Sequence, residues 1–364
     1  MKKTSRTSIG LAACAVWVIA AAMLWPVSSQ AQTGAPRYEV DTSWPMPWPE
    51  RWVIGPLGAV CVDAQDHVLL LNRQELVDVD LDAGQKAPAV IELDPAGRVV
   101  NSWNDGVFTP LLINAFHSCH FDADNNVWIL STESGMVRKY SHDGKTVLLQ
   151  IGKSDVVDSS DGTLKGKPLN SNAALFFSPA DISVDRSNGD VYVDDGDGAG
   201  NHRIAVMDRT GKFLRQWQPQ AGRSIHCMAM ANDGLVYLCD RRANRLQVYD
   251  KMGGLMKNID IPWKQYTPVA SGDSKRQSGA AGSAVDISLS RDANQRLVYV
   301  INQNNSQIDI LDRQTGKVLS SLGRSGHLPG QFDQPLGIDV DSKGNVYVTE
   351  NRGKRVQKFK MVGQ

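Results

Sequence analysis

Net charge is absent from this chain of 364 residues, because 39 lysines and arginines balance 39 aspartates and glutamates. Without a basic excess, the chain has no broad electrostatic attraction for phosphate backbones or anionic lipid surfaces. Long apolar runs are also absent beyond the first thirty residues. We therefore expect no nucleic-acid partner and, in the mature form, no association with a membrane.

The one long apolar run lies near the N-terminus. Three basic residues precede it, it extends over residues 9–24, and Ser29-Gln30-Ala31 offers a small-x-small cleavage site. This pattern predicts a secretory signal peptide over residues 1–31, cleaved after Ala31, and hence a secreted or periplasmic protein. An uncleaved N-terminal anchor is the alternative, because the run is long for a signal peptide but short for a membrane span.

A repeat accounts for most of the remaining sequence. Six times, an apolar stretch, a polar turn and a second apolar stretch follow one another, most cleanly in QPLGIDVDSKGNVYVTENRGKRVQKF at the C-terminal end. Within each copy, two short runs alternate apolar and polar residues around a turn in which Gly or Asn can take positive φ. The copies begin at Leu57, His117, Ser178, His226, Ala284 and Gln334.

Several copies continue into a second hairpin, as in RIAVMDRTGKFLRQW at residues 203–217. Four strands per unit, repeated roughly every 45–65 residues, are typical of propeller blades. We therefore predict an all-β fold, a six-bladed β-propeller with four antiparallel strands per blade, over residues 56–364. Residues 32–55 form an N-terminal lead-in, in which a strand near Tyr38–Val40 is placed to complete the last blade and cover its edge.

Aligning the six units puts histidines and arginines at equivalent positions near the channel axis. A position near the entry of the first strand holds His117 and His226, where the other units have small or apolar residues. A position just past the second strand holds Arg73 in unit one and Arg241 in unit four, which lie opposite each other in a ring of six. Neutral imidazoles are common zinc ligands, and paired guanidinium groups suit a carboxylate or an oxyanion. These four side chains are candidates for one site at a channel mouth, although each could also be a structural histidine or a rim ion pair.

The repeats resemble NHL repeats, and their arrangement over essentially the whole mature chain resembles the peptidyl-α-hydroxyglycine α-amidating lyases. The resemblance implies a six-bladed propeller with a three-histidine zinc site, a catalytic tyrosine and arginines at the channel mouth. The arginines fall on Arg73, in VLLLNR, and Arg241, in CDRRANR, and two zinc histidines fall on His117 and His226. The stretch GDVYVDDGDGAGNHRIAVMDRTGKFLRQW also follows the family's third unit.

Two residues of the family pattern are missing. Asp197 stands where the resemblance places the tyrosine, and Leu336, in QPLGID, stands where it places the third zinc histidine. A catalytic zinc normally keeps three protein ligands, so we expect zinc to bind weakly unless another side chain completes the site. The candidates for that role are Asp197, His120, His202 and His327, of which His327 is the most interesting because its loop leads directly to position 336.

The cysteines and the other histidines carry weaker signals. Four cysteines lie beyond the cleavage site: Cys61, Cys119, Cys227 and Cys239. All fall in or beside predicted inner strands, so we expect buried free thiols that behave as small apolar residues. Export also permits disulfides, and a Cys119–Cys227 bridge near the axis stays open as an alternative. His67 and His142 fall in predicted turns, and we expect His142 to face solvent.

These residues favour an exported NHL-repeat propeller of the amidating-lyase-like group that binds a small or peptide ligand at the channel mouth, and they leave open whether it is an enzyme. Any lyase activity would use Arg73 and Arg241 to stabilise an oxyanion, with Asp197 as the candidate general base. A weakly bound zinc at His117 and His226 would act as a Lewis acid. The alternative is a non-catalytic scaffold whose rim loops bind another exported protein or a glycan. A calcium-dependent lactonase or esterase ranks last, because the predicted axial positions lack acidic and amide ligands.

Overall fold

The computed structural model describes Met1 and residues 34–82, 84–104, 115–132, 134–198, 200–220, 225–264 and 282–363. The predicted signal peptide and its cleavage site at Ala31 lie outside these residues. Ala35–Gln364 form one compact unit, and only this unit is described below. Within the described ranges, no helix has the length and apolar character needed to cross a membrane.

Six four-stranded antiparallel sheets form the blades. Blade 1 contains β3 (Leu57–Val62), β4 (Val68–Asn72), β6 (Val90–Leu93) and β7 (Val99–Trp103). Blade 2 contains β8 (Phe116–Phe121), β9 (Val127–Ser131), β10 (Met136–Tyr140) and β11 (Val147–Gly152), and blade 3 contains β12 (Asp181–Val184), β13 (Val191–Asp195), β14 (Arg203–Met207) and β15 (Phe213–Trp217). Blade 4 contains β16 (Ile225–Met230), β17 (Val236–Asp240), β18 (Arg245–Tyr249) and β19 (Leu255–Asp260), and blade 5 contains β20 (Ala284–Leu289), β21 (Leu297–Asn302), β22 (Gln307–Asp312) and β23 (Val318–Leu322). Blade 6 contains β24 (Pro335–Val340), β25 (Val346–Glu350), β26 (Arg355–Gly363) and the N-terminal β1 (Arg37–Val40).

Short elements accompany the blades. Strands β2 (Trp52–Val53) and β5 (Gln85–Lys86) form a small parallel pair beside blade 1. The 3₁₀-helices η1 (Asp78–Leu81), η2 (Arg241–Ala243) and η3 (Gln303–Asn305) follow the second strands of blades 1, 4 and 5. The predicted six-bladed propeller with four antiparallel strands per blade is confirmed.

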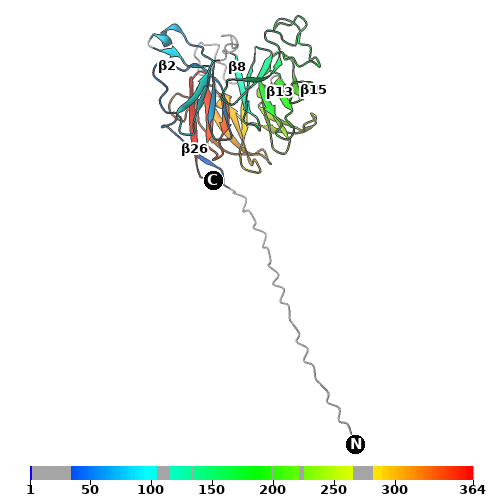
Figure 1. Ribbon diagram of the computed structural model, residues 1–364. Coiled ribbons are helices and arrows are strands. Elements are labelled where there is room, and N and C mark those ends of the chain that lie inside the picture. The colour runs from blue at the N-terminus through cyan, green and yellow to red at the C-terminus, as the bar shows by residue number, and fades with distance from the viewer. Residues whose placement is uncertain are drawn as a thin grey trace. The chain divides into compact units, whose positions relative to one another are not determined.

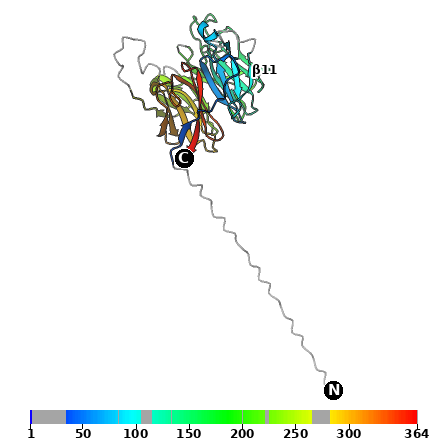
Figure 2. The same cartoon turned by 90° about the vertical axis from the view of Figure 1, so that its left-hand side faces the viewer.

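The N-terminal strand closes the ring. β1 pairs antiparallel with β26, and Figure 1 shows the blue β1 beside the red β26. Inner strand β24 of blade 6 also packs against β3 of blade 1, so the first and last blades lie side by side, as the turned view in Figure 2 shows. The prediction that a strand near Tyr38–Val40 completes the last blade is therefore confirmed. Closure of this kind covers a sheet edge that would otherwise be open to pairing with another chain.

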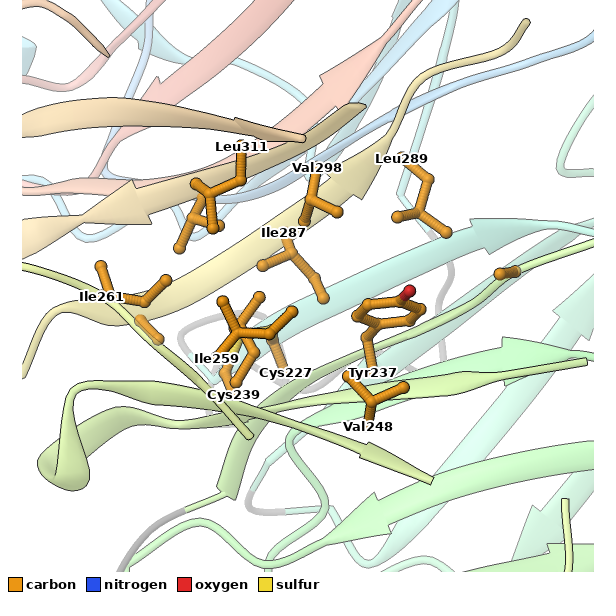
Figure 3. Packing of buried hydrophobic residues seen from close by; sticks show 14 residues of the cluster. Cys227, Tyr237, Cys239, Val248, Ile259, Ile261, Ile287, Leu289, Val298 and Leu311 are labelled. Atoms are coloured by element: carbon orange, nitrogen blue, oxygen red, sulfur yellow. A yellow bond between two sulfur atoms is a disulfide. The ribbon is translucent and has the colours of Figure 1, made fainter. Parts of the chain in front are cut away.

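The core lies between the blades. Successive side chains of a strand point to opposite faces of its sheet, so each middle strand supplies two cores. In β13, Val191 and Val193 pack toward blade 2, whereas Tyr192 packs toward blade 4. Figure 3 shows one such interface, where Tyr237 and Ile259 of blade 4 meet apolar side chains of blade 5 such as Ile287. Middle strands such as β13 thus bury apolar side chains on both faces, as expected for sheets that are stacked on both sides.

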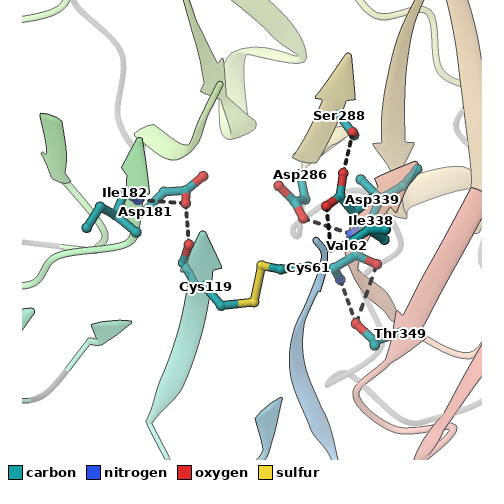
Figure 4. The surroundings of a disulfide bond; sticks show 12 residues. Cys61, Val62, Cys119, Asp181, Ile182, Asp286, Ser288, Ile338, Asp339 and Thr349 are labelled. Atoms are coloured by element: carbon teal, nitrogen blue, oxygen red, sulfur yellow. Dashed lines mark hydrogen bonds between the residues drawn. A yellow bond between two sulfur atoms is a disulfide. The ribbon is translucent and has the colours of Figure 1, made fainter. Parts of the chain in front are cut away.

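Two disulfides overturn the expectation of free thiols. Cys61 bonds Cys119, which joins the inner strands of blades 1 and 2 (Figure 4), and Cys227 bonds Cys239 within blade 4. The Cα atoms are 6.0 and 4.9 Å apart, within the range that a disulfide spans. The alternative Cys119–Cys227 bridge is also wrong. Its partners lie on inner strands two blades apart, whereas Cys61 and Cys119 lie on neighbouring ones.

Carboxylates connect inner strands that cannot pair with one another as a sheet. Asp181 of blade 3 accepts hydrogen bonds from the Ser118 hydroxyl of blade 2 and the Met228 amide of blade 4, the latter at 2.6 Å. Asp286 of blade 5 accepts one from the Ile338 amide of blade 6 at 2.9 Å. Figure 4 shows the bond between Asp286 and Ile338, together with the bonds that Asp339 accepts from the Val62 amide and the Ser288 hydroxyl. The inner ring is therefore held by side-chain carboxyl acceptors as well as by apolar packing.

Candidate functional site

A central cavity of about 430 Å³ runs along the inner strands of all six blades. His117 and His226 line one end of it, and each is the second residue of its inner strand, in β8 and β16. Leu336 is the second residue of β24 and also lines the cavity. Blades 2, 4 and 6 are alternate blades of the ring, so these three positions are related by an approximate threefold arrangement.

The two imidazole rings meet across blade 3. Their centroids are 4.6 Å apart, and the rings lie edge to face at 65°. Nδ1 of His117 is 2.8 Å from the carbonyl oxygen of Ala180, and Nδ1 of His226 is 2.8 Å from that of Val285. A carbonyl oxygen only accepts, so both Nδ1 atoms carry hydrogen, and Nε2 is left with the lone pair in each neutral ring.

Burial keeps both rings neutral. It lowers the pKa of His117 to about 4, with Asp197 opposing the shift and the Arg73 guanidinium adding to it. Burial also lowers the pKa of His226 well below its usual value, and Arg241 and His117 contribute further. A neutral imidazole whose Nδ1–H is already held by a carbonyl is the form in which histidine binds metal.

Asp197 is the third member of this group. It follows β13 on a half-buried turn, and its amide donates to the carbonyl oxygen of Ser178 at 3.2 Å. A carboxylate oxygen of Asp197 and one ring nitrogen from each of His117 and His226 lie within 4.8 Å of one another. Two imidazoles and a carboxylate form a donor set used by catalytic zinc, so the residues present fit that ion.

Arg73 reaches the same end of the channel because Gly58 leaves room for it. Its Nε donates to the carbonyl oxygen of Phe116 in the next blade at 2.8 Å. A Cβ at Gly58 would lie 2.2 Å from that oxygen and 3.0 Å from Nε of Arg73. The absence of a side chain at position 58 is thus what admits the guanidinium group between blades 1 and 2.

Arg241 approaches from the opposite side of the ring, at the first position after β17. Its Nη2 donates to Oε1 of Gln303 at 3.2 Å, whereas its Nε is buried without a hydrogen-bond partner among the described residues. Burial lowers the pKa of both guanidinium groups, and the Asp197 carboxylate opposes the shift at each. The positive charges of Arg73 and Arg241 therefore lower the pKa of both imidazoles, and both arginines interact electrostatically with the Asp197 carboxylate. Neither arginine lines the cavity itself.

The other candidate ligands do not join this group in the described part of the chain. His327 is 80% exposed and its Nδ1 faces Asp333 at 3.8 Å, so it does not fill the position of Leu336. His120 lines the cavity, but three residues further along β8, and its buried Nε2 has no partner. His142, expected to face solvent, is half-buried with Nε2 directed at Glu92.

Sequence alignment missed two kinds of residue. Gln303 is the first residue after β21, the same register as Arg73 and Arg241, so extending the alignment to unit five would have found it. Asp181 and Asp286 line the cavity, which corrects the expectation that the axis lacks acidic residues. Burial raises the pKa of Asp181 to about 6 and that of Asp286 well above its usual value.

Comparisons with known proteins agree with this architecture. Residues 332–359 match the family model of the NHL repeat. NHL repeat-containing protein 3 is 27% identical in its human form, over 60% of this chain and 58% of that protein, and 26% identical in its mouse form, over 89% and 84%. The chain is an NHL-repeat propeller.

The propeller is also related to amidating enzymes. Peptidyl-glycine alpha-amidating monooxygenase B of Xenopus laevis is 23% identical over 88% of this chain, which spans only 35% of that protein. Among solved structures, one titled Streptogramin B lyase structure superposes with a TM-score of 0.52 at 15% identity, covering 89% of this chain and 97% of that one. At this identity, the structural likeness shows the fold alone.

Proposed function

We propose that this propeller is an exported lyase of the amidating type, which binds a peptide or small ligand with a terminal carboxylate at the channel mouth. The observation that carries the proposal is the grouping of two neutral imidazoles and one carboxylate where His117 and His226 line the cavity, with the guanidinium groups of Arg73 and Arg241 near enough to lower the pKa of both imidazoles. For a peptidyl-α-hydroxyglycine, the reaction would break the bond between the amide nitrogen and the hydroxylated carbon.

Arg73 and Arg241 would bind the carboxylate of the substrate. Guanidinium groups pair with carboxylates through two parallel hydrogen bonds, and the buried Nε of Arg241 has a hydrogen to donate. Burial lowers the pKa of both guanidinium groups, and a ligand carboxylate would favour their charged form. This role requires only binding, and it would hold for a catalytic and a non-catalytic propeller alike.

Asp197 would take the proton of the substrate hydroxyl. As that O–H bond breaks, a carbonyl forms on the carbon, the C–N bond breaks, and its electron pair goes to the amide nitrogen. The nitrogen then takes up one proton, which leaves a peptide amide and glyoxylate, with atoms and charge balanced. A carboxylate two residues beyond the end of β13 thus replaces the tyrosine that the resemblance leads one to expect.

Zinc fits the donor set of His117, His226 and Asp197, and when bound it would supply Lewis-acid polarisation of the substrate oxygen. One carboxylate oxygen suffices for a metal ligand, which leaves the second oxygen of Asp197 free to accept a proton. Leu336, at the equivalent position of blade 6, offers no ligand atom in place of a third imidazole, so we propose weak zinc binding.

A non-catalytic ligand-binding propeller is the second candidate. It is favoured by the same two departures, Asp197 in place of the tyrosine and Leu336 in place of a histidine. Two disulfides support export under either proposal, because such bonds persist in oxidising compartments.

The test is glyoxylate release from a peptidyl-α-hydroxyglycine by purified mature protein, with zinc added and with zinc removed. We expect release by the wild type and at least about a 100-fold lower rate for Asp197→Asn. Saturable peptide binding without glyoxylate would support the non-catalytic candidate. If the protein neither binds the peptide nor releases glyoxylate, both candidates are contradicted. Metal analysis of the wild type and of His117→Ala would show whether zinc occupies this group.

A further inference from the structure

A second group of metal-ligating side chains lies at the other end of the inner strands, between blades 1 and 2. Asp63 directly follows β3, His67 directly precedes β4, Glu92 is in β6, and His142 is in the turn between β10 and β11. One ligand atom from each of the four lies within 4.8 Å of the others. This group shares no residue with the site at His117 and His226.

The distances inside this group suit a small tetrahedral ion. Nδ1 of His67 is 2.8 Å and Nε2 of His142 is 3.1 Å from Oε1 of Glu92, and Nε2 of His142 is 3.6 Å from Oδ2 of Asp63. Ligands that bind zinc at ~2.0–2.1 Å in a tetrahedron are roughly 3.3 Å from one another. These three separations bracket that value, so the ligand atoms are close enough together to bind one small ion.

The orientation of His142 also suits a metal ligand. Its Nδ1 is 3.0 Å from the carbonyl oxygen of Asn125, to which it donates. The Asn125 amide nitrogen is 3.2 Å from the same atom, but its two hydrogens go to Gln65 and Asp63 at 2.7 and 3.4 Å. With Nδ1 donating to this carbonyl, the Nε2 atom faces the carboxylates of Glu92 and Asp63, and a cation bound between them would use its lone pair. An Nδ1–H held by a backbone carbonyl is the usual support of a metal-bound histidine.

Charge balance provides a third argument. Asp63 is 1% exposed and Glu92 is 3% exposed. Their ion pairs in the described structure are to His67 and His142, and none involves Lys or Arg. Two buried carboxylates need two positive charges nearby. A divalent cation with two neutral imidazoles supplies them and satisfies all four side chains at once.

We propose that Asp63, His67, Glu92 and His142 form a binding site for a divalent transition-metal ion of the zinc type, which links blades 1 and 2. Four protein ligands leave no open position, so the ion is structural. The Cys61–Cys119 disulfide joins the same two blades, and Asp63 lies two residues beyond Cys61. The ion and the disulfide would both connect blade 1 to blade 2.

Cobalt(II) titration of the metal-free mature protein tests the proposal, because tetrahedral cobalt absorbs strongly in the visible range whereas zinc is silent. We expect one equivalent in His117→Ala, in which the axial group is disabled, and a higher melting temperature when zinc is added. His142→Gln in the same background should weaken binding at least ~100-fold, whereas His327→Gln, which changes an exposed histidine, should not.

Glu92→Gln keeps the size of the buried side chain and provides a second variant should His142→Gln fail to fold. Absence of cobalt binding in His117→Ala and in the wild type would overturn the proposal. So would binding that neither His142→Gln nor Glu92→Gln weakens. A loss of thermal stability in His142→Gln without any metal binding by the wild type would also overturn it, and would identify an ion-pair network with protonated imidazoles.

Discussion

The imidazole rings of His117 and His226 lie edge to face with centroids 4.6 Å apart, although 109 residues separate them in the chain. Each ring is fixed from behind by a backbone carbonyl of the following blade, at Ala180 and Val285. Equivalent strand positions in blades 2 and 4 thus bring two imidazole rings close enough together to act as a pair of nitrogen ligands. The same geometry predicts what a third histidine would do.

Leu336→His should raise zinc affinity by at least ~10–100-fold, because it adds a neutral ligand at the equivalent position of blade 6. Leu336→Ala removes the same apolar side chain without adding a ligand and is the matched control. Calorimetric titration with zinc checks both variants. Equal affinities for the two would show that position 336 does not face His117 and His226 closely enough to share an ion.

Gly58→Ala should lower the free energy of unfolding by at least about 2 kcal/mol. The new Cβ would lie 2.2 Å from the carbonyl oxygen of Phe116, a backbone atom that cannot move aside cheaply, and 3.0 Å from Nε of Arg73. Urea denaturation measures the change. Unchanged stability would mean that blades 1 and 2 separate easily at this point, contrary to the close packing described.

The sequence predicts the parts of this site that depend on register within one repeat. Alignment of the six turns puts His117 and His226 at equivalent positions, and their rings lie together in the structure, because every blade repeats the same strand order. The alignment says nothing about contacts that exist only once. The Cys61–Cys119 bond is of this kind, since its residues meet only through the stacking of two different blades.

The sequence also does not predict features that depend on the stacking of different blades. The group of Asp63, His67, Glu92 and His142 combines two turns and one middle strand of neighbouring blades, so no single repeat contains its pattern. The sequence suggested an exposed turn for His142, whereas stacking against blade 1 half-buries it. Asp181 and Asp286 lie on inner strands and line the cavity, whereas an acidic residue in an alternating strand is typical of a solvent-facing position.

The two disulfides should differ in their contribution to stability. Cys61–Cys119 closes a separation of 58 residues and Cys227–Cys239 one of 12. In the chain-entropy model, removing the first by a double Cys→Ser change should cost about 1.4 kcal/mol more than removing the second in the same way. Chemical denaturation of the two double variants measures the difference. A larger loss on removing Cys227–Cys239 would contradict this order.

His120 should make stability depend on pH. Burial lowers its pKa to about 4, with Arg186 adding to the shift, Asp122 opposing it and Arg291 adding a smaller contribution. A histidine whose pKa is lower in the folded than in the unfolded protein contributes its full stabilisation of the fold above pH 6.5, its pKa in the unfolded protein. This contribution is lost as the pH falls from 6.5 to 4. The slope should approach about 1.4 kcal/mol per pH unit.

His120→Gln should remove this part of the pH dependence, and His327→Gln should leave it intact, because His327 is 80% exposed. Urea titrations between pH 4 and 7 provide the comparison. Parallel curves for His120→Gln and the wild type would indicate that folding does not shift the pKa of His120, contrary to the effect expected from its burial.

The central claim is that the channel mouth recognises a carboxylate through its arginines. The most direct measurement compares the affinity for a glycine-terminated peptide with that for the same peptide as its amide, in wild type, Arg241→Gln and Arg242→Gln. Charge-assisted hydrogen bonds contribute ~1.5–3 kcal/mol, so the wild type should prefer the free carboxylate by roughly 10–150-fold. Arg241→Gln should lose that preference, and Arg242→Gln, which changes an exposed neighbour, should keep it. Equal binding of acid and amide by the wild type, or an unchanged preference in Arg241→Gln, would contradict the account.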